Sequence, residues 1–253
     1  MVSEIVGATA DVDIVMPLGA DPHDFAAGAR QAEAMEAADL LVINGAGFEE
    51  GMADVIEQAA AGGTPVFDAA AQLQLVDGDP HLWMDPTRMN TVVEALGERL
   101  AELPGVDAAA VVGRADDYRE QLEALDDEMA ATLATVAEDE RVLVTNHEVL
   151  GYFAERFGFE VLGAVIPSRS TGAQASAGEL EQLALTVRDA GVGAIFGETT
   201  QPVELAEALA AEVGGDVEVI ELFTESLGEA GSGAETYVDM MRTNAQLVAD
   251  GLS

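Results

Sequence analysis

The chain has 253 residues, of which 49% are hydrophobic, and its 48 Asp and Glu against 10 Lys and Arg give a formal net charge of −38. This composition supports a folded core and excludes a disordered chain, and the acid excess excludes a binder of nucleic-acid phosphates or of an anionic membrane surface. The absence of cysteine excludes disulfides, thiolate metal ligands and a cysteine nucleophile.

Short apolar runs alternate with helical stretches along the chain, which is typical of an α/β protein with mainly parallel sheets. Most of the runs are rich in Val and Ile and end in Gly, Asn, Pro or an acid. The predicted strands are 11–16, 40–45, 65–68, 141–146, 160–165, 193–198 and 218–222. The predicted helices include 26–38, 52–61, 86–103, 177–190 and 202–213.

A longer helix is predicted over residues 108–137, which contain no proline and one glycine, Gly113. Its apolar side chains recur at spacings of three and four, so they line one face. They are Tyr118, Leu122, Leu125, Met129 and Leu133. Two interpretations stay open: a hairpin arm or two helices broken at Gly113, and a rigid connector between an N-terminal and a C-terminal lobe.

The acidic residues are interleaved with Ala, Val and Leu along the whole length, so we place them on the outer faces of helices. All ten basic residues are arginine. Self-repulsion on this scale destabilises a compact state unless it is screened, and the Debye length falls to about 3 Å in 1 M salt. The composition therefore predicts a protein from a halophilic source.

No run of about 20 uninterrupted apolar residues is present, so we expect no membrane span. No basic segment followed by an apolar one opens the chain. The protein is therefore either cytoplasmic or directed by a targeting segment upstream of Met1.

The chain has three histidines, each in or beside a loop. His23 and His147 follow predicted strands, and His81 precedes a helix that Asp85 would cap ahead of Pro86. In open α/β sheets, ligands bind at the carboxyl ends of strands. Three imidazoles suit Zn²⁺, and a carboxylate must supply the fourth ligand because no cysteine or further histidine remains.

Glu225, after the last predicted strand, is the best candidate for that carboxylate, with Glu221 and Glu229 as rivals. The only tryptophan, Trp83, lies two residues after His81 and is placed to wall the site from water. The spacing alone is not specific, because the residues are widely separated and no HExxH pattern is present.

Several ordered motifs resemble the substrate-binding proteins of zinc/manganese ABC importers, a family of metal-binding lipoproteins. The Pro-x-Gly-Ala-Asp-Pro-His signature is matched at 17–23, His-x-Trp-x-Asp-Pro at 81–86 and His-x-x-x-Gly-Tyr-Phe at 147–153. Further similarities are Ala-Asp-Leu at 38–40, the Asn-Gly turn at 44–45, Glu198, Gln201, Tyr237, Met241 and Asn244. The resemblance runs from about Val6 to the end of the chain.

The resemblance implies two α/β lobes with mainly parallel sheets, joined by one long rigid helix, as in periplasmic binding proteins that hold metals. The implied boundaries are an N-terminal lobe at 1–107, a connecting helix at 108–137 and a C-terminal lobe at 138–253. The N-terminal lobe lacks the family's first strand.

The resemblance also implies a metal held between the lobes. The implied ligands are His23 and His81 of the N-terminal lobe with His147 and Glu225 of the C-terminal lobe. Three imidazoles and one carboxylate favour Zn²⁺, whereas Mn²⁺ prefers more oxygen ligands, so a manganese-specific member is the alternative. Because ligand histidines must be neutral, affinity is expected to fall as the pH drops through about 6.5.

The function implied is that of a non-enzymatic, monomeric protein that delivers the ion to a membrane permease and binds no nucleic acid. Its location would be extracellular and membrane-associated, with the signal and lipid anchor outside this chain. A zinc hydrolase using Glu148 as a base is disfavoured, since no second histidine follows His147 at the required spacing. A structural or adhesive metal protein is a further alternative.

Overall fold

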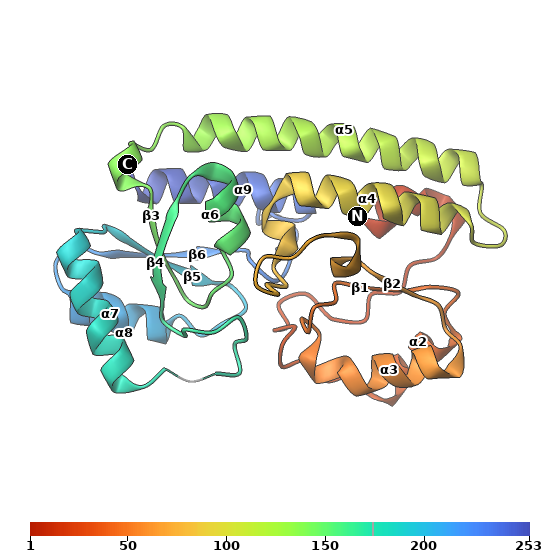
Figure 1. Cartoon of the computed structure of the whole chain (residues 1–253), viewed down its shortest axis with the longest axis horizontal. Helices are drawn as coiled ribbons and strands as arrows, with labels where there is room; N and C mark the ends of the chain where they lie inside the picture. Colours follow the sequence, from red (N-terminus) through yellow and green to blue (C-terminus); the bar gives the residue numbers. More distant parts are fainter. Residues whose placement is uncertain (174) are drawn as a thin grey trace. The chain divides into compact units, whose positions relative to one another are not determined.

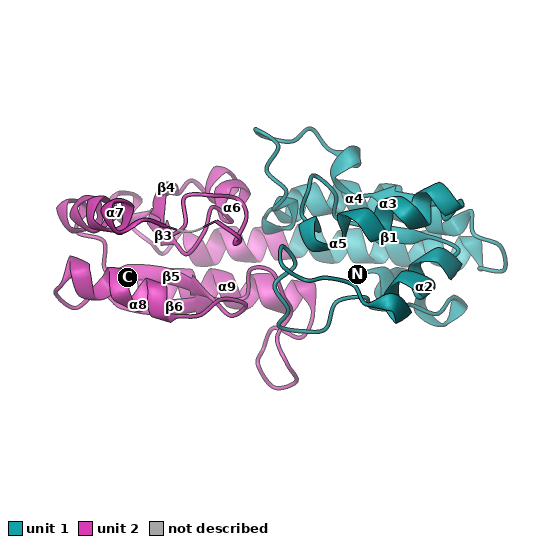
Figure 2. Cartoon of the chain, turned by 90° about the horizontal axis from the view of Figure 1, so that it is seen from below, with its two compact units in different colours: residues 1–124 teal, residues 125–253 magenta. Residues whose placement is uncertain are grey.

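The computed structural model describes residues 1–173 and 175–253. The chain divides into two compact units, unit 1 (Met1–Ala124) and unit 2 (Leu125–Ser253), which Figure 2 colours separately. Each unit contains a parallel sheet with helices around it, so the predicted α/β class with parallel sheets is confirmed.

Unit 1 is built on a two-stranded parallel sheet (Figure 1). Its strands are β1 (Leu41–Ile43) and β2 (Val66–Asp68). Its helices are α1 (Val2–Val6), α2 (Ala29–Ala37), α3 (Ala53–Gly62) and α4 (Pro86–Ala101), together with most of α5 (Ala108–Leu133), whose last turns belong to unit 2.

Apolar side chains from α2, β1, α3 and the 3-10 turn before α3 form one core of unit 1. Met35, Leu41, Met52 and Ala59 are buried together there. Helix α3 ends at Gly63, whose φ of 106° lies in the left-handed region, and the Gly63 N–H bonds back to the carbonyls of Ala59 and Ala60. Glycine suits this position because it adopts positive φ without a Cβ clash.

The predicted strand at residues 11–16 is wrong: the segment forms no strand. The alternation of Val12 and Ile14 gives it β propensity, but a strand also needs a hydrogen-bonded neighbour. Across the described ranges, β1 pairs with β2 alone, and a cavity of about 950 Å³ is lined by both residues 11–16 and β1. The segment therefore has no ladder partner, and Ile14 is 81% exposed.

Helix α5 carries the predicted apolar stripe on one face, and all five of its residues are at most 4% exposed. The proposed break at Gly113 is wrong, because the helix runs continuously through this position. Gly97 of α4 lies against Ala115 of α5, where an added Cβ would come within 2.6 Å of the alanine methyl. The small residue lets the two helices approach closely.

Unit 2 is built on a four-stranded parallel sheet in the order β4-β3-β5-β6 (Figure 1). Its strands are β3 (Val142–Thr145), β4 (Glu160–Ala164), β5 (Ala194–Glu198) and β6 (Glu218–Leu222). Its helices are α6 (Gly151–Phe157), α7 (Ala177–Ala190), α8 (Glu204–Val213) and α9 (Tyr237–Gly251).

Alternate residues of β5 supply the two faces of this sheet, as the strand period of two requires. Ile195 packs into the core formed with α7 and α8. Phe196 points the other way, toward α9, where a Cβ on Gly251 would lie 3.5 Å from its ring and 2.4 Å from Ile220. The sheet of unit 2 is therefore covered on both faces.

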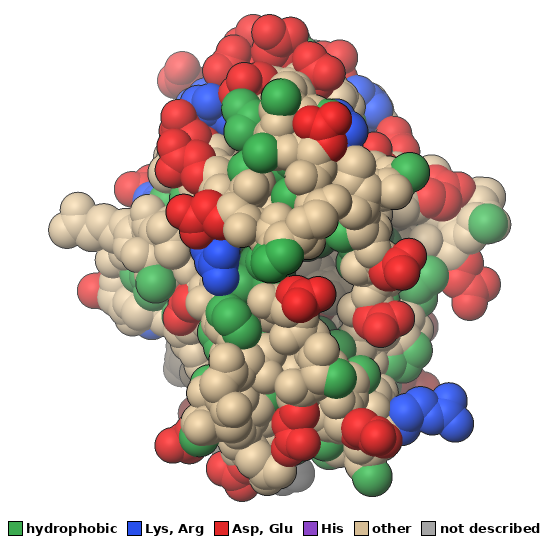
Figure 3. Space-filling view, turned by 90° about the vertical axis from the view of Figure 1, so that its right-hand side faces the viewer, with side chains coloured by type: hydrophobic (Ala, Val, Ile, Leu, Met, Phe, Trp, Pro, Cys, Tyr) green, Lys and Arg blue, Asp and Glu red, His purple; other side chains and the backbone are tan. Residues whose placement is uncertain are grey.

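On the face shown in Figure 3, acidic side chains lie at many places among hydrophobic and other side chains, with several arginines between them. Within the described part of the chain, no helix is both long and apolar enough to cross a membrane.

Candidate metal centre

Four polar residues of unit 2 lie at the carboxyl ends of β3, β5 and β6. His147 follows β3, Glu198 ends β5, and Thr224 and Glu225 follow β6. Because β5 lies between β3 and β6 in the sheet, Glu198 stands between the segments that carry His147 and Glu225. This is the sheet edge at which open α/β folds bind ligands.

Both ring nitrogens of His147 face carboxylates. Nδ1 lies 2.5 Å from Glu198 Oε1, and Nε2 lies 3.3 Å from Glu225 Oε1. The backbone N–H of His147 also donates to Glu198 Oε1 at 3.1 Å. The other oxygen of Glu198, Oε2, accepts a hydrogen bond of 2.8 Å from the Thr224 hydroxyl.

Two carboxylates around one imidazole set the charge of His147. Desolvation by burial lowers the pKa of His147, but hydrogen bonds and charge attraction from Glu198 and Glu225 outweigh it and raise the pKa from 6.5 to about 10. The metal-free site thus holds a proton at neutral pH. For this histidine we therefore expect proton competition with a metal to extend above the midpoint near 6.5 of an ordinary imidazole.

Glu225 differs from its two rivals in its surroundings. Its side chain is fully buried, and the Thr200 hydroxyl donates to its Oε2 at 3.3 Å. Glu221 and Glu229 are exposed. Of the three acids considered from the sequence, Glu225 is therefore the one that lies beside a buried histidine.

Unit 1 brings His23 and His81 together, with ring centroids 5.8 Å apart and exposures of 3% and 0%. Each ends an Asp-Pro-His turn of the same form. Asp21 Oδ1 accepts the His23 N–H at 2.9 Å, and Asp79 Oδ1 accepts the His81 N–H at 3.0 Å. Aspartate favours such turns because its side chain accepts a hydrogen bond from the backbone N–H two residues later, and proline favours them because its ring fixes φ.

Aromatic rings border these two histidines. Trp83 lies 5.4 Å from the His81 ring, centroid to centroid, as its sequence position suggested. Phe48 lies 5.2 Å from the His23 ring and 4.6 Å from Trp83. No motif points to Phe48, because it reaches these rings only through the fold of the loop after β1.

The loop after β1 supports the turn that carries His81. Asn44 Nδ2 donates to the Pro80 carbonyl at 2.9 Å, while Glu49 accepts from the backbone N–H groups of Asn44 at 2.6 Å and Gly45 at 3.1 Å. Burial raises the pKa of the Glu49 carboxyl, although these hydrogen bonds oppose the rise. Gly45 has a φ of 82°, and a Cβ there would overlap Asp68.

Helix α4 starts as predicted, with Pro86 at its first position and Asp85 as its cap. Asp85 Oδ1 accepts the Thr87 N–H at 2.8 Å. The cap fixes where the segment after His81 enters the helix.

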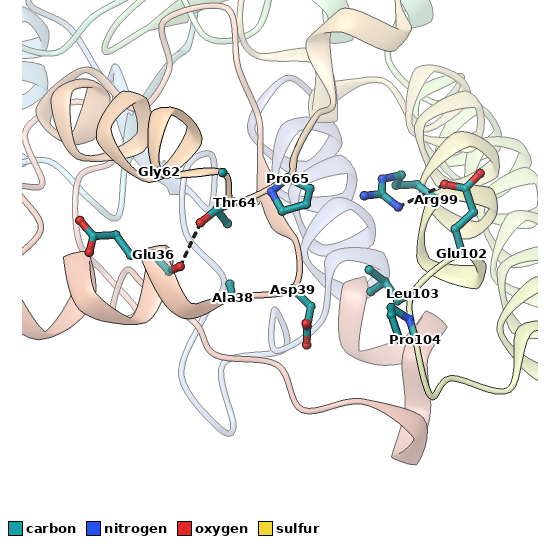
Figure 4. Close-up of a pocket in the computed structure, with 11 residues that line it drawn as sticks. Glu36, Ala38, Asp39, Gly62, Thr64, Pro65, Arg99, Glu102, Leu103 and Pro104 are labelled. Carbon is teal, nitrogen blue, oxygen red and sulfur yellow. Dashed lines mark hydrogen bonds and ion pairs between the residues drawn. The ribbon is translucent and has the colours of Figure 1, made fainter.

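A separate hollow in unit 1, of about 490 Å³, is lined by residues at the ends of α2, α3 and α4 (Figure 4). Arg99 Nη1 lies 3.2 Å from Glu102 Oε2, and the Thr64 hydroxyl donates to the Glu36 carbonyl at 3.1 Å. The lining of this hollow includes no imidazole, so its chemistry does not suit a transition metal.

Each unit gathers its own potential metal ligands. Unit 1 offers two imidazoles, and unit 2 offers one imidazole and one carboxylate. Imidazole suits zinc and other transition metals, whereas carboxylates also serve manganese. The chemistry available at these residues is therefore capture of a divalent transition-metal ion.

Comparison with known proteins agrees with this chemistry. The family model described as zinc-uptake complex component A, periplasmic, matches residues 1–251. The chain is 31% identical over 268 residues to the zinc-binding protein TroA of Treponema pallidum, covering 100% of this chain and 86% of that protein. It is 29% identical over 258 residues to the manganese-binding lipoprotein MntA of Halalkalibacterium halodurans, covering 100% and 85%.

Solved structures show the same fold. The structure of the periplasmic zinc-binding protein TroA from Treponema pallidum superposes with a TM-score of 0.92 at 31% identity, covering 100% of this chain and 94% of that one.

Proposed function

Because the chain belongs to the zinc-uptake component A family of substrate-binding proteins of zinc/manganese ABC importers, we propose that it captures Zn²⁺ and delivers it to a membrane permease. Members of this family are metal-binding transport components, not enzymes, so the hydrolase alternative is set aside.

We propose that four residues coordinate one ion: His23 and His81 of unit 1 with His147 and Glu225 of unit 2. The support lies within each unit. The imidazoles of unit 1 are neighbours in a buried aromatic setting, and His147 Nε2 lies 3.3 Å from the buried carboxylate of Glu225. Imidazole and carboxylate are side chains that bind zinc, and here both kinds lie buried within the fold.

Zn²⁺ is the proposed cargo, and the single observation that carries it is the donor set. Three imidazoles and one carboxylate give a four-ligand site of the kind that zinc prefers, while manganese favours more oxygen ligands. The named relatives include both a zinc-binding and a manganese-binding protein, so the alternative cargo is Mn²⁺.

The test is elemental analysis of protein purified without chelator, followed by competition between Zn²⁺ and Mn²⁺ in calorimetry. We expect one Zn²⁺ per chain and displacement of Mn²⁺ by Zn²⁺. His147→Ala should weaken Zn²⁺ binding sharply while the metal-free fold persists, and Glu229→Gln, an exposed acid, is the matched control. Preferred retention of Mn²⁺ would reject the zinc assignment, and equal zinc affinity in His147→Ala would remove His147 from the site.

We propose that the protein works outside the cytoplasm at the membrane surface, as a monomer joined to its permease only during delivery. The long helix α5, which carries residues of both units, is the proposed connector of the two lobes. Sedimentation of the metal-loaded protein checks the monomeric state.

We also propose adaptation to concentrated salt. A net charge of −38 without a single lysine leaves strong self-repulsion that salt screens. The melting temperature should rise from dilute buffer to molar KCl, and equal stability in both would refute the adaptation.

A further inference from the structure

One carboxylate oxygen in each unit accepts two hydrogen bonds from the same histidine. Glu198 Oε1 lies 3.1 Å from the backbone nitrogen of His147 and 2.5 Å from its Nδ1. Asp79 Oδ1 lies 3.0 Å from the backbone nitrogen of His81 and 2.7 Å from its Nδ1. The two acids come from unrelated places in the sequence, one two residues before its histidine and the other 51 residues after it.

This two-point contact fixes both the position and the orientation of an imidazole. An ionised carboxylate only accepts hydrogen bonds, so the ring nitrogen beside it carries the proton, and Nε2 is left as the nitrogen for a metal. Glu198 and Asp79 are 2% and 5% exposed, so water competes little for these contacts. A histidine held in this way also gains basicity toward a metal.

Glu198 also has a second connection within unit 2. Its Oε2 accepts the Thr224 hydroxyl at 2.8 Å, and Thr224 directly precedes Glu225. Because β5 is flanked by β3 and β6, one side chain at its end holds the segments that carry His147 and Glu225. Both oxygens of Glu198 are therefore occupied by groups of unit 2.

We infer that Glu198 and Asp79 are positioning residues that orient His147 and His81 through Nδ1, and that Glu198 also sets the distance between His147 and Glu225 before any metal arrives. This rests on the proposed function for the metal, but the orientation itself is a property of the metal-free protein. Neither acid is a ligand in this arrangement.

The test uses the full chain and nuclear magnetic resonance of ¹⁵N-histidine. In the metal-free wild type, the His147 Nδ1–H should appear as a slowly exchanging proton, because it is buried and bonded to Glu198. Glu198→Gln should speed the exchange of that proton, because a neutral amide oxygen accepts more weakly than a carboxylate, and should lower Zn²⁺ affinity about 10–100-fold. Glu221→Gln, the same change on an exposed acid of the neighbouring strand β6, should change neither.

Two further variants separate positioning from general loss of structure. Thr224→Val should keep the His147 Nδ1–H signal but weaken Zn²⁺ binding, because it removes only the link toward Glu225. Asp79→Asn should speed the exchange of the His81 Nδ1–H and leave that of His147 unchanged, which keeps the inference testable if Glu198→Gln does not fold.

The outcomes are distinct. A wild type that shows both protected ring protons but binds no Zn²⁺ would overturn the proposed function and leave the orientation by Glu198 and Asp79 supported. A wild type without a protected His147 Nδ1–H, or a folded Glu198→Gln protein with unchanged signal and zinc affinity, would overturn the inference.

Discussion

Zinc binding should release a proton from His147, because the metal and the proton compete for the same imidazole. The pKa of His147 in the metal-free protein is raised from 6.5 to about 10 by Glu198 and Glu225, against the effect of burial. At pH 7.5 a group with that pKa is almost fully protonated, whereas an ordinary histidine would hold roughly 0.1 proton. The structure therefore predicts release of about one proton from this residue for each Zn²⁺ bound.

The assay is calorimetry of Zn²⁺ binding at pH 7.5 in several buffers that differ in ionisation enthalpy. The slope of the apparent enthalpy against the buffer enthalpy gives the number of protons released. Between about pH 7 and 10 the apparent affinity should rise as the pH rises, since fewer protons compete. Release near 0.1 proton, or an affinity that levels off just above pH 6.5, would refute the raised pKa or the role of His147 as a ligand.

The same shift predicts how the stability of the metal-free protein depends on pH. Because the pKa of His147 is higher in the folded state than in the unfolded state, its protonation stabilises the folded state fully below pH 6.5. This stabilisation is lost as the pH rises toward 10, so the melting temperature should fall over that interval. His147→Gln should make the fall smaller. Leu122→Ala, at a site 1% exposed, should cost about 2–5 kcal/mol in urea unfolding, while Val112→Ala on the exposed face of α5 should stay within about 0.5 kcal/mol; equal costs would contradict the assigned buried face. Gly97→Ala in α4 should destabilise by about 1–3 kcal/mol, since the added methyl would meet the Ala115 methyl, which cannot rotate away, at 2.6 Å. Gly178→Ala in α7, where a Cβ meets no described atom within 4 Å, is the matched control and should not destabilise.

Much of unit 2 could be predicted because its signals are local. The helix Ala177–Ala190 and the strand Glu218–Leu222 have the bounds that periodicity and composition indicate. Helix α7 begins with Ser176 and Glu179 bonding each other's backbone and ends at Gly191 with a φ of 68°, signals that are written in the sequence itself.

What the sequence could not predict depends on contacts between distant residues. The strand expected at 11–16 needed a neighbour that its own residues do not reveal. Glu198 meets His147 only because β5 lies next to β3, an order that no spacing encodes. Asp79, two residues before His81, could have been found, since Asp-Pro-His occurs twice and its aspartate bonds the histidine backbone both times.

Strand β1 pairs with β2 on one side, and its other edge faces the cavity of about 950 Å³ and pairs with no strand among the described residues. Alternate residues of a parallel strand bond to opposite sides, and Leu41 bonds toward β2, so the peptide groups of Val42 face the cavity that this residue lines. An open edge is a template on which a second polypeptide can add a strand and start aggregation. The charge of −38 makes each molecule repel its copies, and concentrated salt weakens this protection even as it relieves the repulsion within the fold.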